Sequence, residues 1–296
     1  MSQALPPPVF DPFADGFTDD PYPQYAALRA AAPVYQHPFG FWLLTSYEGV
    51  SWLLRAGLSV EDRNIAPSPM LELREQMYGE EGARRRGVSM LDRDPPDHTR
   101  LRRLVSKAFT PRAVQALQPR ITALVDDMLD AAGQRGRVDL VDALAFPLPF
   151  AVIAEMLGTP PADPALIANG VEELLRYDSP VQASRRITTE PVRVGDVTIP
   201  AGAFVMASLG SANRDEGFWG PDAGELRLDR ANARQHVSFG AGPHHCLGAY
   251  LARLEASIAL ARLTARFPGL ALDGPVVWNG RINLRGPARL PVSPGT

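Results

Sequence analysis

The chain contains a single cysteine, Cys246, and it lies in a glycine-rich loop that leads directly into a helical pattern. The run from Phe239 to Gly248 reads FGAGPHHCLG. A lone cysteine forms no intramolecular disulfide, and the N–H groups of such a loop and of a following helix favour an anionic sulfur. The loop therefore predicts a thiolate that binds a ligand. The alternative is a buried, inert cysteine.

These ten residues fit the pattern F-G-x-G-x-H-x-C-x-G, and the loop resembles the haem-binding loop of the cytochrome P450 superfamily, bacterial members included. In that family the cysteine thiolate is the axial ligand of haem iron and favours O–O cleavage. The resemblance implies that heme b (iron protoporphyrin IX) is the cofactor and that Cys246 is the metal ligand. It assigns cofactor-binding roles to further loop residues: Phe239, Gly240, Gly242, His244 and Gly248. Gly248 has no Cβ that would hold the helix away from a flat macrocycle.

A second motif, His98-Thr99-Arg100-Leu101-Arg102, is similar to the family's H-T-x-x-R helix. His98 and Arg102 are four residues apart and share one helix face. The resemblance implies that both bind a haem propionate through charge-assisted hydrogen bonds, together with His244 and, on a less specific match, Arg186. The alternative for the helix alone is a solvated basic face.

The third motif is E-x-x-R, formed by Glu173 and Arg176, which can pair on one helix face. In the family this pair is structural and helps to hold the cysteine loop. The family often adds a second arginine as partner of the glutamate. Glu225 falls where that arginine would be, and Arg227 or Arg230 are the candidates to replace it.

One family segment has no counterpart here. The long central helix with the stretch A-G-x-[DE]-T is missing, and the resemblance covers about residues 8–160 and 161–290. We therefore expect one haem-thiolate domain over residues 1–296 with a deletion seam near 159–162. No catalytic residue is identified, because the acid–alcohol pair lies in the absent segment. The loss predicts partly uncovered side chains at Leu251, Leu254 and Ile258, and a surface for self-association or for a partner.

The expected fold class is mainly α with small β-sheets, a cytochrome P450 fold without the substrate-roof helices and the central helix. Periodicity, proline and glycine positions predict the individual elements. The first two helices expected are residues 24–32 and a helix that is capped by Thr45–Glu48 and stops near Gly57. Asp94-Pro95 opens the next helix, and Thr110-Pro111 caps the one after it. A further helix is split at Pro119 and ends at Gly133, and the last runs from 247 to 267. The strands expected are 34–37 and 41–44, with a hairpin over 192–199 turning at Gly195-Asp196. Residues 58–90 read as a long loop with a helical turn.

Composition limits the functional classes. The net charge of −3 indicates no general attraction to nucleic acid. The longest apolar run, residues 143–154, is too short to span a bilayer, and the N-terminus shows no signal-peptide pattern. A single cysteine fits a reducing compartment, so we expect a cytoplasmic protein. His37, His236 and His245 have no partner pattern, and we expect His236 to be structural.

The resemblance implies a monooxygenase that inserts one oxygen atom from O₂ into a small hydrophobic organic substrate. Electrons would come from a ferredoxin or flavoprotein redox partner. This partner would bind at the basic cluster formed by Arg102, Arg103, Lys107 and Arg112. The alternative is that this cluster is a plain solvated face. Three alternatives stay open. The chain is a haem-binding but oxygenation-deficient protein (peroxide-driven or accessory), a partner-binding protein that needs no haem, or a deletion product without function.

Overall fold

The computed structural model describes residues 8–69, 71–72, 76, 89–134, 137–149, 152 and 168–293. The seam expected near residues 159–162 lies outside these residues, as does much of the loop expected over 58–90. Among the described residues, no helix is both long and apolar enough to cross a membrane.

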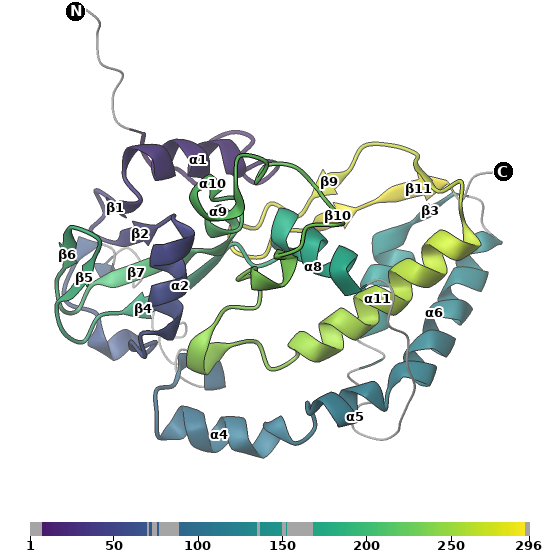
Figure 1. Ribbon diagram of the computed structural model, residues 1–296, viewed down its shortest axis with the longest axis horizontal. Coiled ribbons are helices and arrows are strands. Elements are labelled where there is room, and N and C mark those ends of the chain that lie inside the picture. The colour runs from purple at the N-terminus through teal and green to yellow at the C-terminus, as the bar shows by residue number, and fades with distance from the viewer. Residues whose placement is uncertain are drawn as a thin grey trace, which may run out of the picture.

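The described chain is mainly helical, with short strands, as the sequence predicts (Figure 1). The helices are α1 Tyr22–Ala31, α2 Tyr47–Arg55, α4 Asp97–Ser106, α5 Pro111–Gln115, α6 Gln118–Gly133, α8 Ala168–Tyr177, α9 Leu209–Ala212, α10 Glu216–Trp219 and α11 Ala249–Arg266. Single helical turns are η1 Asp62–Asn64, η2 Met90–Asp92, η3 Val141–Ala145, η4 Ala233–Gln235 and η5 Gly242–His244. The strands are β1 Val34–Gln36, β2 Trp42–Leu44, β3 Val138–Asp139, β4 Ala183–Ile187, β5 Val192–Val194, β6 Val197–Ile199, β7 Phe204–Ser208, β8 Ala271–Leu272, β9 Val277–Trp278, β10 Pro287–Arg289 and β11 Pro291–Ser293.

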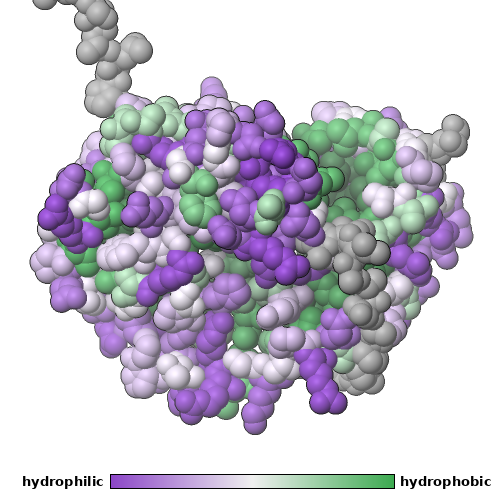
Figure 2. Space-filling view, in the orientation of Figure 1, coloured by the Kyte–Doolittle hydropathy of each residue, from purple (hydrophilic) through white to green (hydrophobic). Residues whose placement is uncertain are grey.

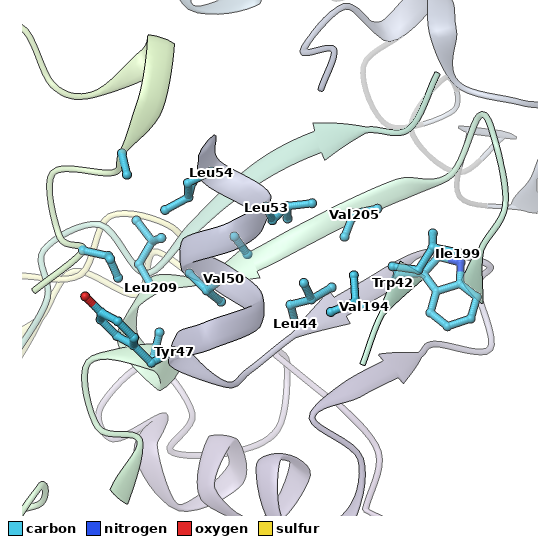
Figure 3. Packing of buried hydrophobic residues seen from close by; sticks show 14 of the residues in the cluster. Trp42, Leu44, Tyr47, Val50, Leu53, Leu54, Val194, Ile199, Val205 and Leu209 are labelled. Atoms are coloured by element: carbon cyan, nitrogen blue, oxygen red, sulfur yellow. The ribbon is translucent and has the colours of Figure 1, made fainter. Parts of the chain in front are cut away.

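The largest sheet has the order β1-β2-β7-β4, in which β2 and β7 run parallel and the other pairs run antiparallel. Helix α2 packs on this sheet, and its Val50 and Leu53 lie against Leu44 and Val205 in one apolar cluster (Figure 3). Burying each such side chain stabilises the fold by about 1.5–3 kcal/mol. This layer fixes the C-terminal end of α2, which carries part of the site described below.

A second core lies between α6 and α11, which run side by side in Figure 1. Residues spaced four apart on α6, Ile121, Val125 and Leu129, form its buried stripe. They share this cluster with Leu251 and Ile258 of α11, and both of these side chains are buried. The prediction that Leu251 and Ile258 are partly uncovered was therefore wrong, because they belong to the core shared with α6. Leu254 is half-buried and packs against the same cluster.

Most of the expected elements are confirmed. The hairpin β5–β6 turns at Gly195 with φ 58°. Thr110 caps α5, and the chain breaks between α5 and α6 just before Pro119. One cap was placed wrongly: Ser46 caps α2 by accepting from the Gly49 N–H, so the helix begins one residue later than a cap at Thr45 would require.

Helix α4 lies at the lower edge of the molecule in Figure 1, away from both cores. His98 is its only buried residue, and Leu104 and Val105 are 68% and 41% exposed. Figure 2 shows hydrophilic side chains gathered along this edge. The helix therefore has little apolar burial of its own to hold it in place.

Candidate functional site

The loop that carries Cys246 is shaped by two glycines and by α2. Gly240 and Gly242 have φ of 68° and 67°, a region that side chains with a Cβ rarely adopt. A Cβ on Gly242 would also collide with the Leu54 carbonyl oxygen at the end of α2. The Cys246 N–H donates to the Phe239 carbonyl oxygen at 2.8 Å, which closes the loop just before α11 begins. The thiol of Cys246 is free and exposed.

His98 of α4 faces this loop. Its ring centroid lies 4.2 Å from that of His244. The His98 side chain is buried, yet its Nε2 atom has no hydrogen-bond partner among the described residues. Leaving a buried polar atom unpaired costs free energy, so the position suits a ligand that supplies the missing partner.

Two arginines flank the histidines. Arg102, one turn after His98, donates to the carbonyl oxygen of His245 at 2.6 Å and so ties α4 to the cysteine loop. Arg186 of β4 is buried, and it donates to the Ser184 hydroxyl and the Arg185 carbonyl rather than to a carboxylate of the described chain. Burial lowers the pKa of Arg186 to about 10, so the guanidinium is still charged at neutral pH.

The electrostatics of this cluster favour an anion. Burial, followed by the nearby His98 and Arg186, lowers the pKa of His244 to about 4. Burial and then Arg102 lower the pKa of His98 as well. Both histidines are therefore neutral at pH 7 beside two charged arginines, with Asp94 offsetting part of that charge. A carboxylate placed here would be stabilised by the arginines and would supply a hydrogen-bond partner for His98 Nε2.

The site therefore fits a haem. An exposed thiol suits an iron ligand, and a cationic cluster with a buried nitrogen that has no partner among the described residues suits a propionate. Two glycines with positive φ shape the loop that carries the thiol. A Cβ on Gly248 would have a ring atom of Phe109 as its nearest neighbour, at 3.9 Å, so the start of α11 is open there. The structure brings together His98, Arg102 and the loop residues that the sequence singled out.

The E-x-x-R pair is fully buried and lies behind the loop. Arg176 donates to both carboxylate oxygens of Glu173 at 2.7 and 2.8 Å, and to backbone carbonyls that include Asn213 and Ala223. Of the two candidates for the second arginine, Arg230 binds the carboxylate with its side chain at 3.1 Å. Arg227 contributes only its backbone N–H.

Three residues near the loop were not identified as site residues from the sequence. Glu172 accepts hydrogen bonds from His236 and from Arg253, and Arg253 lies over the ring of Phe239. His236 was expected to be structural, and it is buried in this network. The only signal for Glu172 was the doublet it forms with Glu173 before the E-x-x-R arginine.

Comparisons with known proteins agree with this geometry. A family model described as Cytochrome P450 matches residues 165–272. Cytochrome P450 107B1 of Saccharopolyspora erythraea is 33% identical over 402 aligned residues, covering 96% of this chain and 97% of the relative. Cytochrome P450 monooxygenase PikC of Streptomyces venezuelae is 32% identical, covering 97% of this chain and 94% of the relative. The alignment with the first relative is longer than this chain of 296 residues, in agreement with a shortened member.

A solved structure, that of the tirandamycin C-bound P450 monooxygenase TamI, superposes with a TM-score of 0.82 at 30% identity, covering 95% of this chain and 99% of TamI. The aligned spans thus run over nearly the whole of both proteins, and the alignment with the first relative includes positions that have no counterpart in this shorter chain. The chain belongs to the cytochrome P450 superfamily, a family of haem-thiolate monooxygenases that bind iron protoporphyrin IX.

Proposed function

We propose that this chain is a haem-thiolate monooxygenase that inserts one oxygen atom from O₂ into a small hydrophobic organic substrate. The observation that carries the proposal is an exposed thiol at Cys246 near a cationic cluster in which the buried His98 Nε2 has no hydrogen-bond partner among the described residues. A sulfur ligand and a separate carboxylate site are the two features that haem-thiolate binding requires.

The residues of the site have three roles: ligation of iron, binding of the propionates and support of the loop. Cys246 would supply the iron ligand, from the loop that its own N–H closes onto the Phe239 carbonyl oxygen. His98, Arg102, Arg186 and His244 hold the propionates, with Arg186 and Arg102 supplying the charge and the histidines supplying hydrogen bonds. Glu173 and Arg176 hold the segment behind the loop. The bound haem supplies the redox chemistry by which the O–O bond is cleaved.

Insertion of one oxygen atom leaves a second, which becomes water by taking up two electrons and two protons. We propose that a ferredoxin or flavoprotein delivers the electrons. Arg103 of α4, Lys107 directly after α4 and Arg112 of α5 are exposed basic residues, and together they suit an acidic partner. The substrate class rests on TamI, whose solved structure has tirandamycin C bound.

The test is the carbon monoxide difference spectrum of the full chain, loaded with haem and reduced. We expect the strongly red-shifted Soret band of a thiolate-ligated haem, and its loss in Cys246→Ser. His98→Ala is expected to keep the band position but to weaken haem binding about tenfold, the effect of losing one charge-assisted hydrogen bond.

Turnover separates the remaining alternatives. Substrate oxidation with a reductase, ferredoxin and O₂ supports the monooxygenase. Oxidation with hydrogen peroxide alone indicates a peroxide-driven protein instead. A wild-type chain that takes up no haem would contradict the proposal.

A further inference from the structure

Glu172 lies on α8 beside the E-x-x-R glutamate, and its carboxylate is saturated with donors. Arg253 of α11 approaches it with two nitrogens, Nε to Oε1 at 2.7 Å and Nη2 to Oε2 at 2.9 Å. His236 Nε2 lies 3.0 Å from Oε2. Burial raises the pKa of Glu172, but hydrogen bonds from His236 and Arg253 outweigh it and hold that pKa at about 2.

The protonation state of His236 follows from its second nitrogen. The Ser238 N–H donates to His236 Nδ1 at 3.1 Å, so Nδ1 carries no proton. Nε2 therefore carries the proton and donates to Glu172. This neutral tautomer locks the Glu172 carboxylate on one side while Arg253 holds it on the other.

Arg253 transmits this fixed geometry to the cysteine loop. Its guanidinium lies over the Phe239 ring, with Cζ 4.5 Å from the ring centroid. Phe239 is the residue whose carbonyl oxygen accepts the Cys246 N–H at 2.8 Å. A continuous path of contacts thus leads from a buried carboxylate on α8, through a planar cation on α11, to the peptide group of the cysteine.

We propose that Glu172 and Arg253 are positioning residues that fix the orientation of the Cys246 loop against α11. The bidentate pair sets the plane of the guanidinium, and that plane sets the ring of Phe239. The link to haem rests on the proposed function, in which Cys246 binds iron. The positioning of the loop itself is a property of the protein chain alone.

The chain offers a matched control for this arrangement. Arg285 donates to Asp178 at 2.8 Å and lies over the Trp278 ring at 3.6 Å. This is a second carboxylate–guanidinium–aromatic group, and it joins the turn after α8 to β9 rather than to the cysteine loop. Asp178→Asn therefore removes a similar ion pair without removing a contact to the loop.

The first measurement follows the amide hydrogen of Cys246, because its bond to the Phe239 carbonyl oxygen closes the loop. In the full chain without haem, we expect this amide to exchange with solvent about tenfold faster in Glu172→Gln and in Arg253→Lys, the effect of losing charge-assisted hydrogen bonds, since lysine keeps the charge but not the planar fork. Asp178→Asn is expected to stay within about twofold of wild type. Wild-type rates in Glu172→Gln and Arg253→Lys, or an equal acceleration in Asp178→Asn, would overturn the proposal.

The second measurement uses the haem-loaded chain. In Glu172→Gln and Arg253→Lys, we expect part of the red-shifted carbon monoxide band to shift to the position typical of a lost thiolate ligand, whereas Asp178→Asn keeps the wild-type band. Bands identical to wild type in both loop variants would overturn the link to the iron ligand. If wild type binds no haem, the proposed function fails, but the exchange rates of the Cys246 amide still decide whether the loop is positioned in this way.

A variant that fails to fold does not block the test. Should Glu172→Gln give no folded chain, Phe239→Leu removes the ring under the guanidinium and leaves the pair between Glu172 and Arg253 in place. We expect its Cys246 amide to exchange about as fast as in Arg253→Lys, and a wild-type rate would count against the proposal.

Discussion

Glu255 is buried on α11, and its Oε1 atom has no hydrogen-bond partner among the described residues. Burial raises the pKa of this carboxyl to about 7 from the ordinary 4.5. The folded chain therefore binds the proton more tightly than the unfolded chain does. The stability that this group contributes is complete below about pH 4.5 and is lost as the pH rises through about 7.

Replacing Glu255 with glutamine removes this dependence on pH. We expect Glu255→Gln to be more stable than wild type by about 1–3 kcal/mol at about pH 8, because no charge is then buried. The advantage is expected to disappear near pH 4.5, where wild type is protonated as well. Urea unfolding of wild type and Glu255→Gln across this pH range measures the two free energies of unfolding. A difference between them that does not change with pH would contradict the raised pKa of Glu255.

For single residues, the sequence predicts a contact where the partner lies nearby in the chain or where the motif is specific. His98 and Arg102 were placed correctly because a four-residue spacing fixes one helix face. The contact between Glu172 and Arg253 joins residues 81 positions apart. Neither residue lies in a motif specific enough to predict that the two side chains pair. A glutamate on a helix has the same pattern whether it is solvated or saturated with donors.

Helix α8 illustrates what can be predicted for an element. The E-x-x-R spacing correctly predicted the pair between Glu173 and Arg176. The second arginine was uncertain because the segment from Pro221 to Arg230 is irregular, and no period relates its side chains to α8. Only the fold shows that Arg230 reaches both Glu173 and Asp222, whereas the Arg227 side chain points to Asp222 and Asp229.

These two arginines make a matched pair of variants. We expect Arg230→Ala to destabilise the fold by about 1–3 kcal/mol, because it removes buried charge-assisted hydrogen bonds to Glu173 and Asp222 and leaves Arg176 as the remaining side-chain partner of Glu173 among the described residues. Arg227→Ala is expected to cost less than about 1 kcal/mol, because its ion pairs are on the surface and its N–H remains. Denaturant unfolding of both variants tests this, and equal losses would show that Arg230 is not the partner that matters.

For the whole molecule, the sequence correctly predicted the fold class and a chain shorter than its relatives. The prediction that one face of α11 is partly uncovered was wrong. An apolar stripe in the sequence shows that a helix packs against another element, but it does not show which element. Here α6 supplies that partner for Leu251 and Ile258. The element left with little support is α4, which buries only His98.

Helix α4 should therefore depend on the cofactor. We expect amide hydrogens of Asp97–Ser106 to exchange rapidly in the chain without haem and to become protected on haem binding, while those of α6 change little. Hydrogen-exchange mass spectrometry of the two forms measures this. Equal exchange of α4 in both forms would mean that the haem does not contact this helix.

The hydrogen bond from Arg102 to the His245 carbonyl joins residues 143 positions apart. During synthesis on the ribosome, α4 is complete long before the cysteine loop emerges. Until then, the loop side of the cofactor site does not exist, and α4 lacks its contacts with His244 and His245. Acquisition of the cofactor must therefore be one of the last events in the biogenesis of this protein, and a nascent chain halted before Cys246 should leave α4 as a preferred target for proteases.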